Sequence, residues 1–513
     1  MLCINIKYIE CFEKMTEKIC KIKLIDQINC RVSGLDMNTN RLCIDKLKVF
    51  VPSARYMPAY KLGRFDGYIR YYSPTGQTTV TLLSEILPII LKAGYTLDLE
   101  KDASVSSSIL TPDDIIDENY LSMYRWPEGH KLAGQPVILG ERQVRAANAL
   151  ITHQQGLGKL ATNFGKTLLC VALGKKILEK GGKLLIIVPK TDLVVQTAQD
   201  FINFGIPCGR IGGKYKEFDK PITVSTWQSL HSANKRKKDD ELSEQELATI
   251  SNGLSAILMD ETHTVTGKAL QQIFTKTFKN VPIRWGISGT IHDDKPVEYY
   301  PLLNAIGPVV VEVNQHELQE TGISSSCSIK VMELMDDNQF TEFGKEQDFL
   351  SRYTERTNFI ANFIANLARE KGNTVVLIPR IKLGENLSKA LNKMGVENVF
   401  LSGKDNVDTR LEYYKDMNNS NGKIILATRQ ILSTGLNIPR IFNLVFIDIG
   451  KSYVTCIQSV GRGLRTHIDK NHIDIYDICS STTFSKRHIA PRIKYYKDEQ
   501  FPVERERIST WKL

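Results

Sequence analysis

The amino-acid sequence predicts an α/β protein in which two tandem doubly wound parallel-sheet domains follow a smaller α/β domain. Short apolar runs alternate with helix-length segments in the middle of the chain, and the same rhythm returns after Ser328. Uninterrupted apolar runs bounded by polar residues are typical of strands buried on both faces of a parallel sheet. The length of 513 residues favours roughly three domains. We therefore expect domains at residues 1–125, 126–315 and 316–513.

The first domain is expected to combine short strands with a helix. Its three β-like runs and one helix-like stretch are, in chain order, Ile19–Ile25, Arg41–Val51, Tyr68–Tyr72 and Leu82–Ala93. The polar segment Asp102–Ser108 and the acidic segment Asp113–Glu118 then change the composition of the chain. Such a change marks a linker or the edge of a domain.

The two larger domains are predicted from alternating strands and helices. In the second domain the strand candidates are Lys183–Val188, Ile222–Ser225 and Ala256–Met259, and the helix candidates are Lys166–Glu179 and Leu193–Phe204. In the third domain the strand candidates are Thr374–Ile378, Lys423–Ala427 and Leu444–Ile447, and the helix candidates are Arg356–Lys371 and Glu385–Lys393.

Composition excludes several classes of protein. With 42% hydrophobic and 24% charged residues, the chain does not resemble disordered, collagen-like or membrane proteins. The first residues carry charges such as Lys7 and Glu10 where a secretory signal has an apolar core, so we expect a cytoplasmic protein. Lys and Arg outnumber Asp and Glu by 67 to 57, a mild basic excess that permits a polyanionic partner without demonstrating one.

The ten cysteines do not form a metal-binding pattern. Five of them fall between Cys3 and Cys43, but none of these lie two to four residues apart, and the first histidine is His130. A structural zinc site needs close pairs of ligands. We therefore expect no structural zinc and reduced thiols.

The segment TNFGKT, Thr162–Thr167, has the residue types of a phosphate-binding loop. In such a loop glycine lets backbone N–H groups approach the phosphates, lysine reaches the terminal phosphates, and the following hydroxyl holds Mg²⁺. The segment departs from the strict pattern, because Leu160 stands where the first glycine is usual and Phe164 precedes Gly165. Alone, so short a match is weak.

Two further motifs strengthen the nucleotide interpretation. DETH, Asp260–His263, follows the apolar run AILM, which places two carboxylates at the carboxyl end of a buried strand, where ligands bind in open α/β sheets. Asp260 would hold Mg²⁺ and Glu261 would orient or deprotonate water; an acidic surface turn is the alternative. In QSVGRGLR, Gln458–Arg465, the arginines at 462 and 465 would share one helix face and neutralise transition-state charge, or would belong to a solvated basic helix.

With these motifs in order, the sequence resembles superfamily 2 helicases, and within them the phage recombination helicases that remodel branched DNA. The resemblance runs from about Lys23 to about Ile478. It is carried by STWQSL (Ser225–Leu230), LMDETHTVTGK (Leu258–Lys268), GISGTIHDD (Gly286–Asp294), LSTGL (Leu432–Leu436) and QSVGRGLRTH (Gln458–His467), and by KLGRFDGYIRYY (Lys61–Tyr72), which is similar to the small DNA-binding domain of that family. The fold that it implies is a pair of RecA-like domains.

The resemblance also implies roles for single residues. Those expected to bind ATP and Mg²⁺ are Gln143, Thr162, Asn163, Phe164, Gly165, Lys166, Thr167, Asp260, Gly435 and Gln458. Lys166, Asp260, Glu261, Arg462 and Arg465 would act in hydrolysis, and His263, Ser288 and Thr290 would couple the nucleotide site to the DNA. Two positions depart from the family: Arg142 replaces an aromatic residue, and Asn437 replaces an aspartate.

Residues expected to contact nucleic acid lie mostly where strands end. They are Pro189, Lys190, Thr226, Trp227, Gln228, Ser402, Gly403 and Thr428, together with Arg55, Lys61, Arg64 and Tyr71 in the N-terminal domain. Taken singly, each could instead be a cap, a turn, a core aromatic or ordinary surface. The basic run Lys235–Lys238 lies in a long connection between Trp227 and Asp260, and we hypothesise that this insertion contacts DNA.

These observations predict an ATP-dependent DNA helicase or translocase that acts on forks, four-way junctions and displacement loops in recombination, repair and replication. We expect a monomer in the cytoplasm of the host, if the protein is a phage protein. Three alternatives remain: an RNA helicase of the same superfamily, the motor subunit of a restriction system, and a binding protein that does not hydrolyse ATP.

Overall fold

The computed structural model divides into two compact units. One contains Met1–Leu160 and Gly165–Glu312, and the other contains Ala161–Phe164 and Val313–Leu513. The residues that the structure describes are 18–102, 105, 107–127, 132–232, 244–264, 267–403, 405, 407–428, 438, 440–452, 457, 459–461, 463, 464, 467 and 469–512. The predicted boundary near residue 125 falls inside the first unit and stays a prediction.

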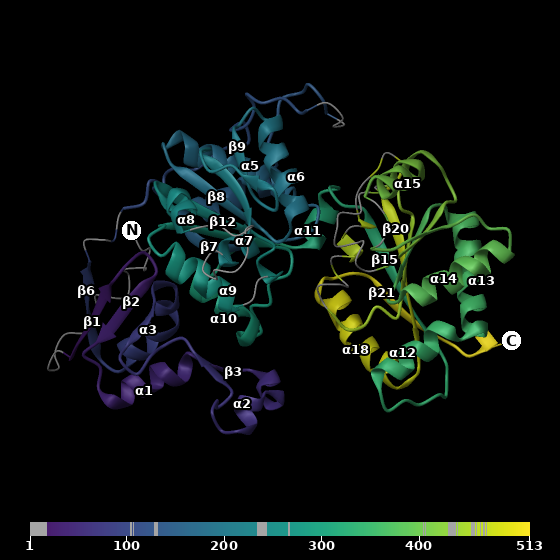
Figure 1. Cartoon of the computed structure of the whole chain (residues 1–513), viewed down its shortest axis with the longest axis horizontal. Helices are drawn as coiled ribbons and strands as arrows, with labels where there is room; N and C mark the ends of the chain where they lie inside the picture. Colours follow the sequence, from purple (N-terminus) through teal and green to yellow (C-terminus); the bar gives the residue numbers. More distant parts are fainter. Residues whose placement is uncertain are drawn as a thin grey trace. The chain divides into compact units, whose positions relative to one another are not determined.

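A large, mostly parallel sheet forms the centre of the first unit (Figure 1). Its strand order is β10-β9-β11-β8-β12-β13-β7-β14, with β10 antiparallel to β9. The strands are β7 (Gln155–Leu160), β8 (Lys183–Val188), β9 (Cys208–Gly212), β10 (Tyr215–Lys216), β11 (Ile222–Thr226), β12 (Leu254–Asp260), β13 (Ile283–Ser288) and β14 (Val309–Val313). The helical segments are α4 (Glu141–His153), α5 (Lys166–Glu179), α6 (Thr191–Asn203), α7 (Trp227–Ser232), α8 (Glu244–Ser251), η4 (Thr262–Thr264), α9 (Gly267–Leu270), the π-helix η5 (Gln271–Thr277) and α10 (Pro296–Ala305).

A smaller sheet, of order β5-β2-β1-β6, forms the N-terminal region of the same unit. Its elements are β1 (Lys18–Leu24), β2 (Asn29–Ser33), α1 (Met37–Lys46), β5 (Gln77–Thr79), η3 (Val80–Leu82), α3 (Leu83–Lys92) and β6 (Tyr95–Lys101). A hairpin of β3 (Lys48–Phe50) and β4 (Tyr68–Arg70) carries η2 (Pro52–Tyr56) and α2 (Pro58–Lys61) between its strands. The core of this region includes Leu303 from α10, with Tyr299 and Tyr300 packed against it, so the two sheets of the unit share apolar contacts.

The second unit contains a seven-stranded sheet of order β17-β18-β16-β19-β20-β15-β21, and its neighbouring strands pair in parallel. The strands are β15 (Ser326–Leu334), β16 (Thr374–Ile378), β17 (Val399–Leu401), β18 (Ile424–Thr428), β19 (Asn443–Ile447), β20 (His472–Ser480) and β21 (Val503–Ile508). The helices are α11 (Gln315–Glu320), α12 (Phe343–Arg352), α13 (Thr354–Lys371), α14 (Ile381–Lys393), α15 (Val407–Asn419), α18 (Thr483–Asp498) and the 3₁₀-helix η6 (Thr510–Lys512).

The predicted fold class is confirmed: two tandem RecA-like sheets follow a small α/β region. Apolar runs explain the central strands, since every residue of β16 and β19 is buried, as a sheet covered on both faces requires. Predicted helix Lys166–Glu179 and predicted strand Lys183–Val188 coincide with α5 and β8.

One predicted strand, Arg41–Val51, is wrong in its first half. Residues up to Lys46 belong to helix α1, and only Lys48–Phe50 is extended. The helix begins because the Asp36 carboxylate accepts a hydrogen bond from the Thr39 N–H, which satisfies one of the free donors of the first turn. Burial of Cys43 on the inner face of α1 then holds the helix against the sheet.

The described residues contain no helix that is long and apolar enough to cross a membrane. The same residues contain no group of three or more His, Cys, Asp or Glu side chains that could hold a metal ion. The seven cysteines within the described ranges are buried and free.

A buried ion pair fixes α18 on the second sheet. Arg492 donates to Asp477 through Nε at 2.7 Å and through Nη2 at 2.9 Å, and both side chains are almost fully buried. The hydroxyl of Tyr496, one turn further along α18, also donates to Asp477 at 3.1 Å. Because the carboxylate lies on β20, this network locks the last long helix to a central strand.

Replacing Asp477 with Ala should destabilise the second unit, because it leaves the Arg492 charge buried without its partner. The expected loss is about 3–5 kcal/mol in the free energy of unfolding. Urea unfolding of the full chain checks this value. The exposed Asp498 on the same helix serves as the control, since Asp498→Ala should change stability by less than about 0.5 kcal/mol. A similar small loss in both variants would contradict the prediction.

Candidate active site

The segment before α5 has the backbone of a phosphate-binding loop. Asn163 and Gly165 both have positive φ angles, of 71° and 90°, and α5 begins immediately afterwards at Lys166. Gln143 on α4 packs against this loop: its Nε2 donates to the Gly165 carbonyl at 3.4 Å, and its Oε1 accepts from the Gly140 N–H at 2.9 Å. The φ of 90° at position 165 is one that side chains rarely adopt, so the position favours glycine, and a Cβ there would also displace Gln143 Nε2, which would lie 2.5 Å away.

Lys166 and the DETH carboxylates meet at one end of the first large sheet. Lys166 Nζ lies 3.4 Å from Glu261 Oε1, and Asp260 is the last residue of β12. Asp260 accepts a hydrogen bond at 2.9 Å from the N–H of Glu261. Glu261 has a φ of 50°, which is uncommon for a residue with a side chain and is typical of strain at functional sites. Phe164 is fully buried, whereas Thr167 is exposed beside Lys166.

The two neighbouring carboxylates respond differently to this environment. Burial and the adjacent Glu261 charge raise the pKa of Asp260 to about 6, despite the opposing effect of Lys166. For Glu261, burial also acts to raise the pKa, but the Lys166 ammonium, His263 and the Ser288 hydroxyl lower it overall. Glu261 is therefore ionised at neutral pH, and Asp260 is the carboxylate whose charge would gain most from a nearby cation.

His263, Ser288 and Thr290 form one buried cluster with Glu261. His263 Nδ1 lies 2.7 Å from Ser288 Oγ and 2.9 Å from Thr290 Oγ1. Ser288 Oγ also lies 3.2 Å from Glu261 Oε2, to which it donates. Burial lowers the pKa of His263 although Glu261 opposes the shift, so the imidazole is neutral at pH 7. The three residues predicted to couple the nucleotide site to DNA thus touch each other and the predicted general base.

The nucleic-acid residues predicted on the first large sheet lie at the ends of two adjacent parallel strands. Pro189 and Lys190 follow β8, and Thr226 closes β11, with Thr226 paired to Val188. Gln228 Nε2 donates to the Pro189 carbonyl at 3.2 Å. Thr226 accepts from the Ser229 N–H, and Trp227 is half-buried against the core, so both residues also have structural roles.

Sequence reasoning missed Lys214 at this edge. Lys214 is exposed in the turn between β9 and β10, directly after Gly212 and Gly213. A Cβ on Gly212 would lie 3.2 Å from Ser229 Oγ, and one on Gly213 would lie 3.5 Å from Thr191 Cγ2. The turn therefore adjoins the starts of α6 and α7. In the sequence, the pair Gly212–Gly213 directly before Lys214 is the signal that could have indicated an exposed lysine in a tight turn.

In the second unit, Ser402 and Gly403 follow β17, and Thr428 is the last residue of the adjacent parallel strand β18. Ser402 donates to Asp405 Oδ2 through its N–H at 2.5 Å and through its hydroxyl at 3.0 Å. Thr428 is buried, and its hydroxyl has no hydrogen-bond partner among the described residues. The predicted site residues Gly435, Gln458, Arg462 and Arg465 lie outside the described residues, as does the basic run Lys235–Lys238.

On the N-terminal hairpin, Arg55, Lys61 and Arg64 are exposed. Tyr71, predicted to share their face, instead packs edge-on against Tyr300 at a ring-centroid distance of 5.8 Å. Apolar side chains that sequence reasoning missed lie among the cations: Tyr56 is 82% exposed and Leu62 is 65% exposed. The hairpin therefore presents aromatic and apolar groups together with positive charge.

Two family models match the chain. "Type III restriction enzyme, res subunit" matches residues 137–293, and "Helicase conserved C-terminal domain" matches residues 355–467. Together these ranges span slightly more than half of the chain. The first range contains the loop at Lys166 and the DETH motif, and the second contains the strands of the second sheet from β16 to β19.

Among curated proteins, the chain is 25% identical to the ATP-dependent DNA helicase uvsW of Enterobacteria phage T4 over 480 residues, which is 87% of this chain and 91% of that protein. Among solved structures, a fragment of a putative HsdR subunit of a type I restriction enzyme from Vibrio vulnificus YJ016 matches with a TM-score of 0.54 and 15% identity, over 94% of this chain and 85% of that one. A single-residue variant of S. cerevisiae Dbp5 bound to RNA and ADP BeF3 matches with a TM-score of 0.51 and 16% identity, over 73% of this chain and 91% of that one.

The two solved structures are evidence for the fold only. The family models and the curated phage relative are evidence for the protein family. Both helicase regions are present in the expected order, and the similarity to the phage protein extends over nearly the whole length of both chains. The chain is therefore a superfamily 2 helicase that resembles the UvsW helicase of phage T4.

Proposed function

We propose that the protein is an ATP-dependent DNA helicase or translocase that unwinds or branch-migrates forks, four-way junctions and D-loops during recombination, repair and replication. The observation that carries the proposal is the contact of Lys166 with Glu261 beside Asp260, at the strand end where nucleotides bind in such sheets. The similarity to a phage DNA helicase over most of the chain supports DNA as the substrate.

In this proposal Lys166 exchanges partners. Its ammonium, which here faces Glu261, would turn to the β- and γ-phosphates of ATP, and the glycine-containing loop would offer its N–H groups. Glu261, freed from the lysine and ionised at neutral pH, would orient the attacking water and accept its proton. Glu261 is hydrogen-bonded to Ser288, which together with His263 and Thr290 forms the buried cluster described above. This cluster would transmit a change in the charge or position of Glu261 to the strand ends that would contact DNA.

The donor set fits Mg²⁺. Asp260 is a carboxylate whose anionic form is disfavoured by burial and by Glu261, and a cation would relieve both effects. The Thr167 hydroxyl, exposed one residue after Lys166, would be the second protein ligand. When bound, Mg²⁺ would neutralise charge on the transferred phosphate. Arg462 and Arg465 would stabilise the transition state, and Gln458 and Gly435 would support the nucleotide; these assignments rest on the sequence motifs.

Two sets of strand ends would track the DNA backbone. The residues that would contact the backbone are Lys190, Gln228 and Lys214 in the first unit, and Ser402 and Thr428 in the second. Contacts of this type read charge and shape and do not read base sequence. The exposed hairpin residues Arg55, Lys61 and Arg64 would add a grip on duplex DNA, and we expect the working unit to be a monomer.

A restriction motor is the second candidate, because the first family model is named after a restriction-enzyme subunit. An RNA helicase is the third. Comparing ATP hydrolysis with forked DNA, linear duplex, single-stranded DNA and RNA separates them. We expect the fork to stimulate hydrolysis most. Equal or greater stimulation by RNA would contradict the proposal, and so would stimulation restricted to linear duplex in the presence of a nuclease partner.

Lys166→Ala should lower DNA-stimulated ATP hydrolysis by about 100-fold or more, because it removes the charge that meets the terminal phosphates. DNA affinity without nucleotide should stay within about twofold of the parent protein. Phosphate release and fluorescence anisotropy measure the two quantities. The matched control is Lys183→Ala, since Lys183 is exposed at the opposite end of β8, and hydrolysis should be unchanged. An active Lys166→Ala protein would refute the assignment.

Asp260→Asn should stabilise the nucleotide-free protein at neutral pH while abolishing Mg²⁺-dependent hydrolysis. The pKa of Asp260 is raised from 3.8 to about 6, so the charged carboxylate costs folding free energy above pH 6. Removing that charge should gain on the order of 1 kcal/mol at pH 8.

The gain should shrink as the pH falls through 6 and vanish below pH 4, where Asp260 is itself neutral in both the folded and the unfolded state. Asn retains an oxygen that can accept from the Glu261 N–H, so the local backbone should not change. Thermal unfolding midpoints between pH 4 and 8 measure this effect. A stability difference that does not depend on pH would show that the charge of Asp260 is not its source.

A further inference from the structure

Helix α18 of the second unit has a buried side and a basic side. Its buried residues recur every three or four positions; they are Ser485, Ile489, Arg492 and Tyr496. Four of its exposed residues are cations; they are Lys486, Arg487, Lys494 and Lys497. At 3.6 residues per turn, these cations fall together on one side of the helix, away from the buried residues. We call these four residues the basic face of α18.

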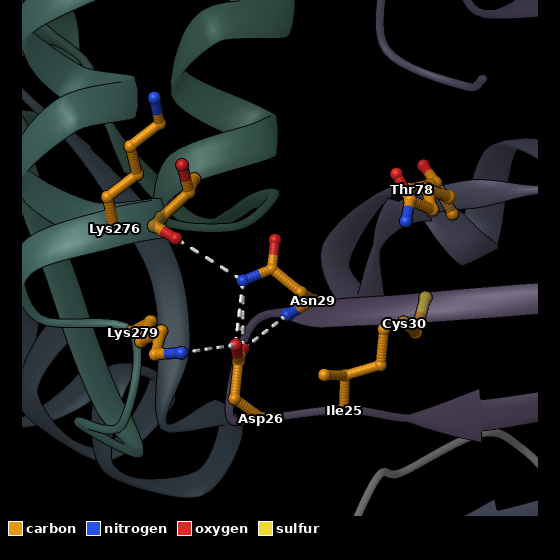
Figure 2. A pocket seen from close by; sticks show the side chains of 9 residues that line it. Ile25, Asp26, Asn29, Cys30, Thr78, Lys276 and Lys279 are labelled. Atoms are coloured by element: carbon orange, nitrogen blue, oxygen red, sulfur yellow. Dashed lines mark hydrogen bonds and ion pairs between the residues drawn. The ribbon is translucent and has the colours of Figure 1, made fainter.

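The charge of the basic face is not offset by ion pairs. The helix contains a single acidic residue, Asp498, in its last turn. None of the four cations has an ion-pair partner among the residues that the structure describes. Lys279 in the first unit differs in this respect: its ammonium lies 4.0 Å from the Asp26 carboxylate, beside a hollow of about 380 Å³ that Figure 2 shows. The basic face of α18 therefore keeps its full positive charge.

An exposed aromatic side chain adjoins the first turn of α18. The helix lies beside α12 in the second unit (Figure 1), and Phe343 at the start of α12 is 46% exposed. The Phe343 ring packs edge-on against Phe484 at a centroid distance of 5.8 Å and lies 5.7 Å from the His488 ring. The guanidinium of Arg487 lies 5.5 Å from the centroid of the same Phe484 ring. An exposed ring and an exposed cation therefore share a neighbour at this end of the helix.

The first turn of α18 is held by a buried carboxylate. Glu346 of α12 is fully buried and accepts hydrogen bonds from the N–H groups of Phe484 and Ser485, each at 2.7 Å. The first N–H groups of a helix have no partner within the helix, and a carboxylate there also favours the helix dipole. Because the pair of Arg492 and Asp477 fixes the later turns, the basic face is presented on a rigid element.

The basic face begins at the edge of the second sheet where nucleic-acid contacts are predicted. The strands β17, β18 and β20 belong to one parallel sheet, so their carboxyl ends lie at the same edge. Ser402 follows β17, Thr428 ends β18, and α18 begins three residues after β20 ends at Ser480. Since β16 and β19 separate β18 from β20, Thr428 and the start of α18 are roughly 14 Å apart, at about 4.8 Å per strand.

We propose that the basic face of α18 and Phe343 bind a single strand of DNA that continues from the predicted contacts at Ser402 and Thr428. The cations neutralise its phosphates, and the exposed ring stacks on an unpaired base. The bases of a duplex are already stacked on one another, so the exposed ring favours a single strand over a duplex. The inference rests on the proposed function, which supplies DNA as the partner, and assigns a surface that holds one separated strand.

The test uses the full chain carrying Lys494→Ala or Phe343→Leu. Affinities for a fluorescent oligothymidylate and for a blunt duplex are measured by anisotropy at several salt concentrations. Lys494→Ala should weaken single-strand binding about 3-fold or more and lower the slope of log affinity against log salt by about 0.7, the value for one phosphate contact on a single strand. Phe343→Leu removes the ring and keeps an apolar side chain; it should weaken single-strand binding about 5-fold or more with an unchanged slope.

Two variants serve as matched controls. Phe343→Tyr keeps an aromatic ring and should bind the single strand as the parent protein does. Lys389→Ala removes an exposed lysine of α14 and should change neither affinity nor slope. Leu387 of α14 and Ile489 of α18 belong to the cores on opposite faces of the second sheet, so Lys389 lies away from the basic face. Affinity for the blunt duplex should stay within about twofold in every variant.

Unchanged single-strand affinity and slope in both Lys494→Ala and Phe343→Leu would overturn the inference. Equal losses on the single strand and on the blunt duplex would also overturn it, by identifying a duplex contact. If Phe343→Leu lowers the unfolding midpoint, Lys494→Ala decides alone, since Lys494 is exposed and unpaired within the described part of the chain. The parent protein's fork-stimulated ATP hydrolysis, measured in parallel, tests the proposed function separately, so the two failures can be told apart.

Discussion

The contact between the Lys166 ammonium and the Glu261 carboxylate is the interaction on which the rest of the site depends. Two adjacent acidic residues at the end of a buried strand repel each other, and the lysine 3.4 Å away offsets that repulsion in the nucleotide-free protein. Three separate features of the chain produce this contact. Gly165 turns the backbone so that α5 begins at Lys166, β12 ends at Asp260, and Glu261 adopts a positive φ. A polyphosphate that binds Lys166 would draw its positive charge away from both carboxylates, so the pKa values of Asp260 and Glu261 would change together.

The fold was predictable wherever burial on both faces dictates residue type. The runs at Lys183–Val188 and Thr374–Ile378 are apolar along their length because parallel strands have no solvated face, and both became strands with the predicted bounds. The half-exposed N-terminal region was harder. Its segment Arg41–Val51 alternates polar and apolar residues in a way that is typical of a strand. Asp36, upstream of this segment, caps helix α1, and the helix continues to Lys46.

The candidate site was predictable where its residues are adjacent in sequence or belong to a recognisable motif. Lys166, Glu261, His263, Ser288 and Thr290 come together as the motifs suggest. Tyr71 could not be placed in advance, because its burial depends on Tyr300, more than two hundred residues away in sequence.

The placement of Leu303 in the N-terminal core also bears on how the protein can be dissected. Leu303 belongs to α10, yet its apolar neighbours include Leu83 and Ile86 from α3. A fragment starting after the first sheet would present this leucine and the flanking tyrosines to water, and exposed apolar patches of that kind promote aggregation. The N-terminal region thus covers an apolar part of the first RecA-like sheet, and removing it would lower solubility whatever its effect on substrate recognition.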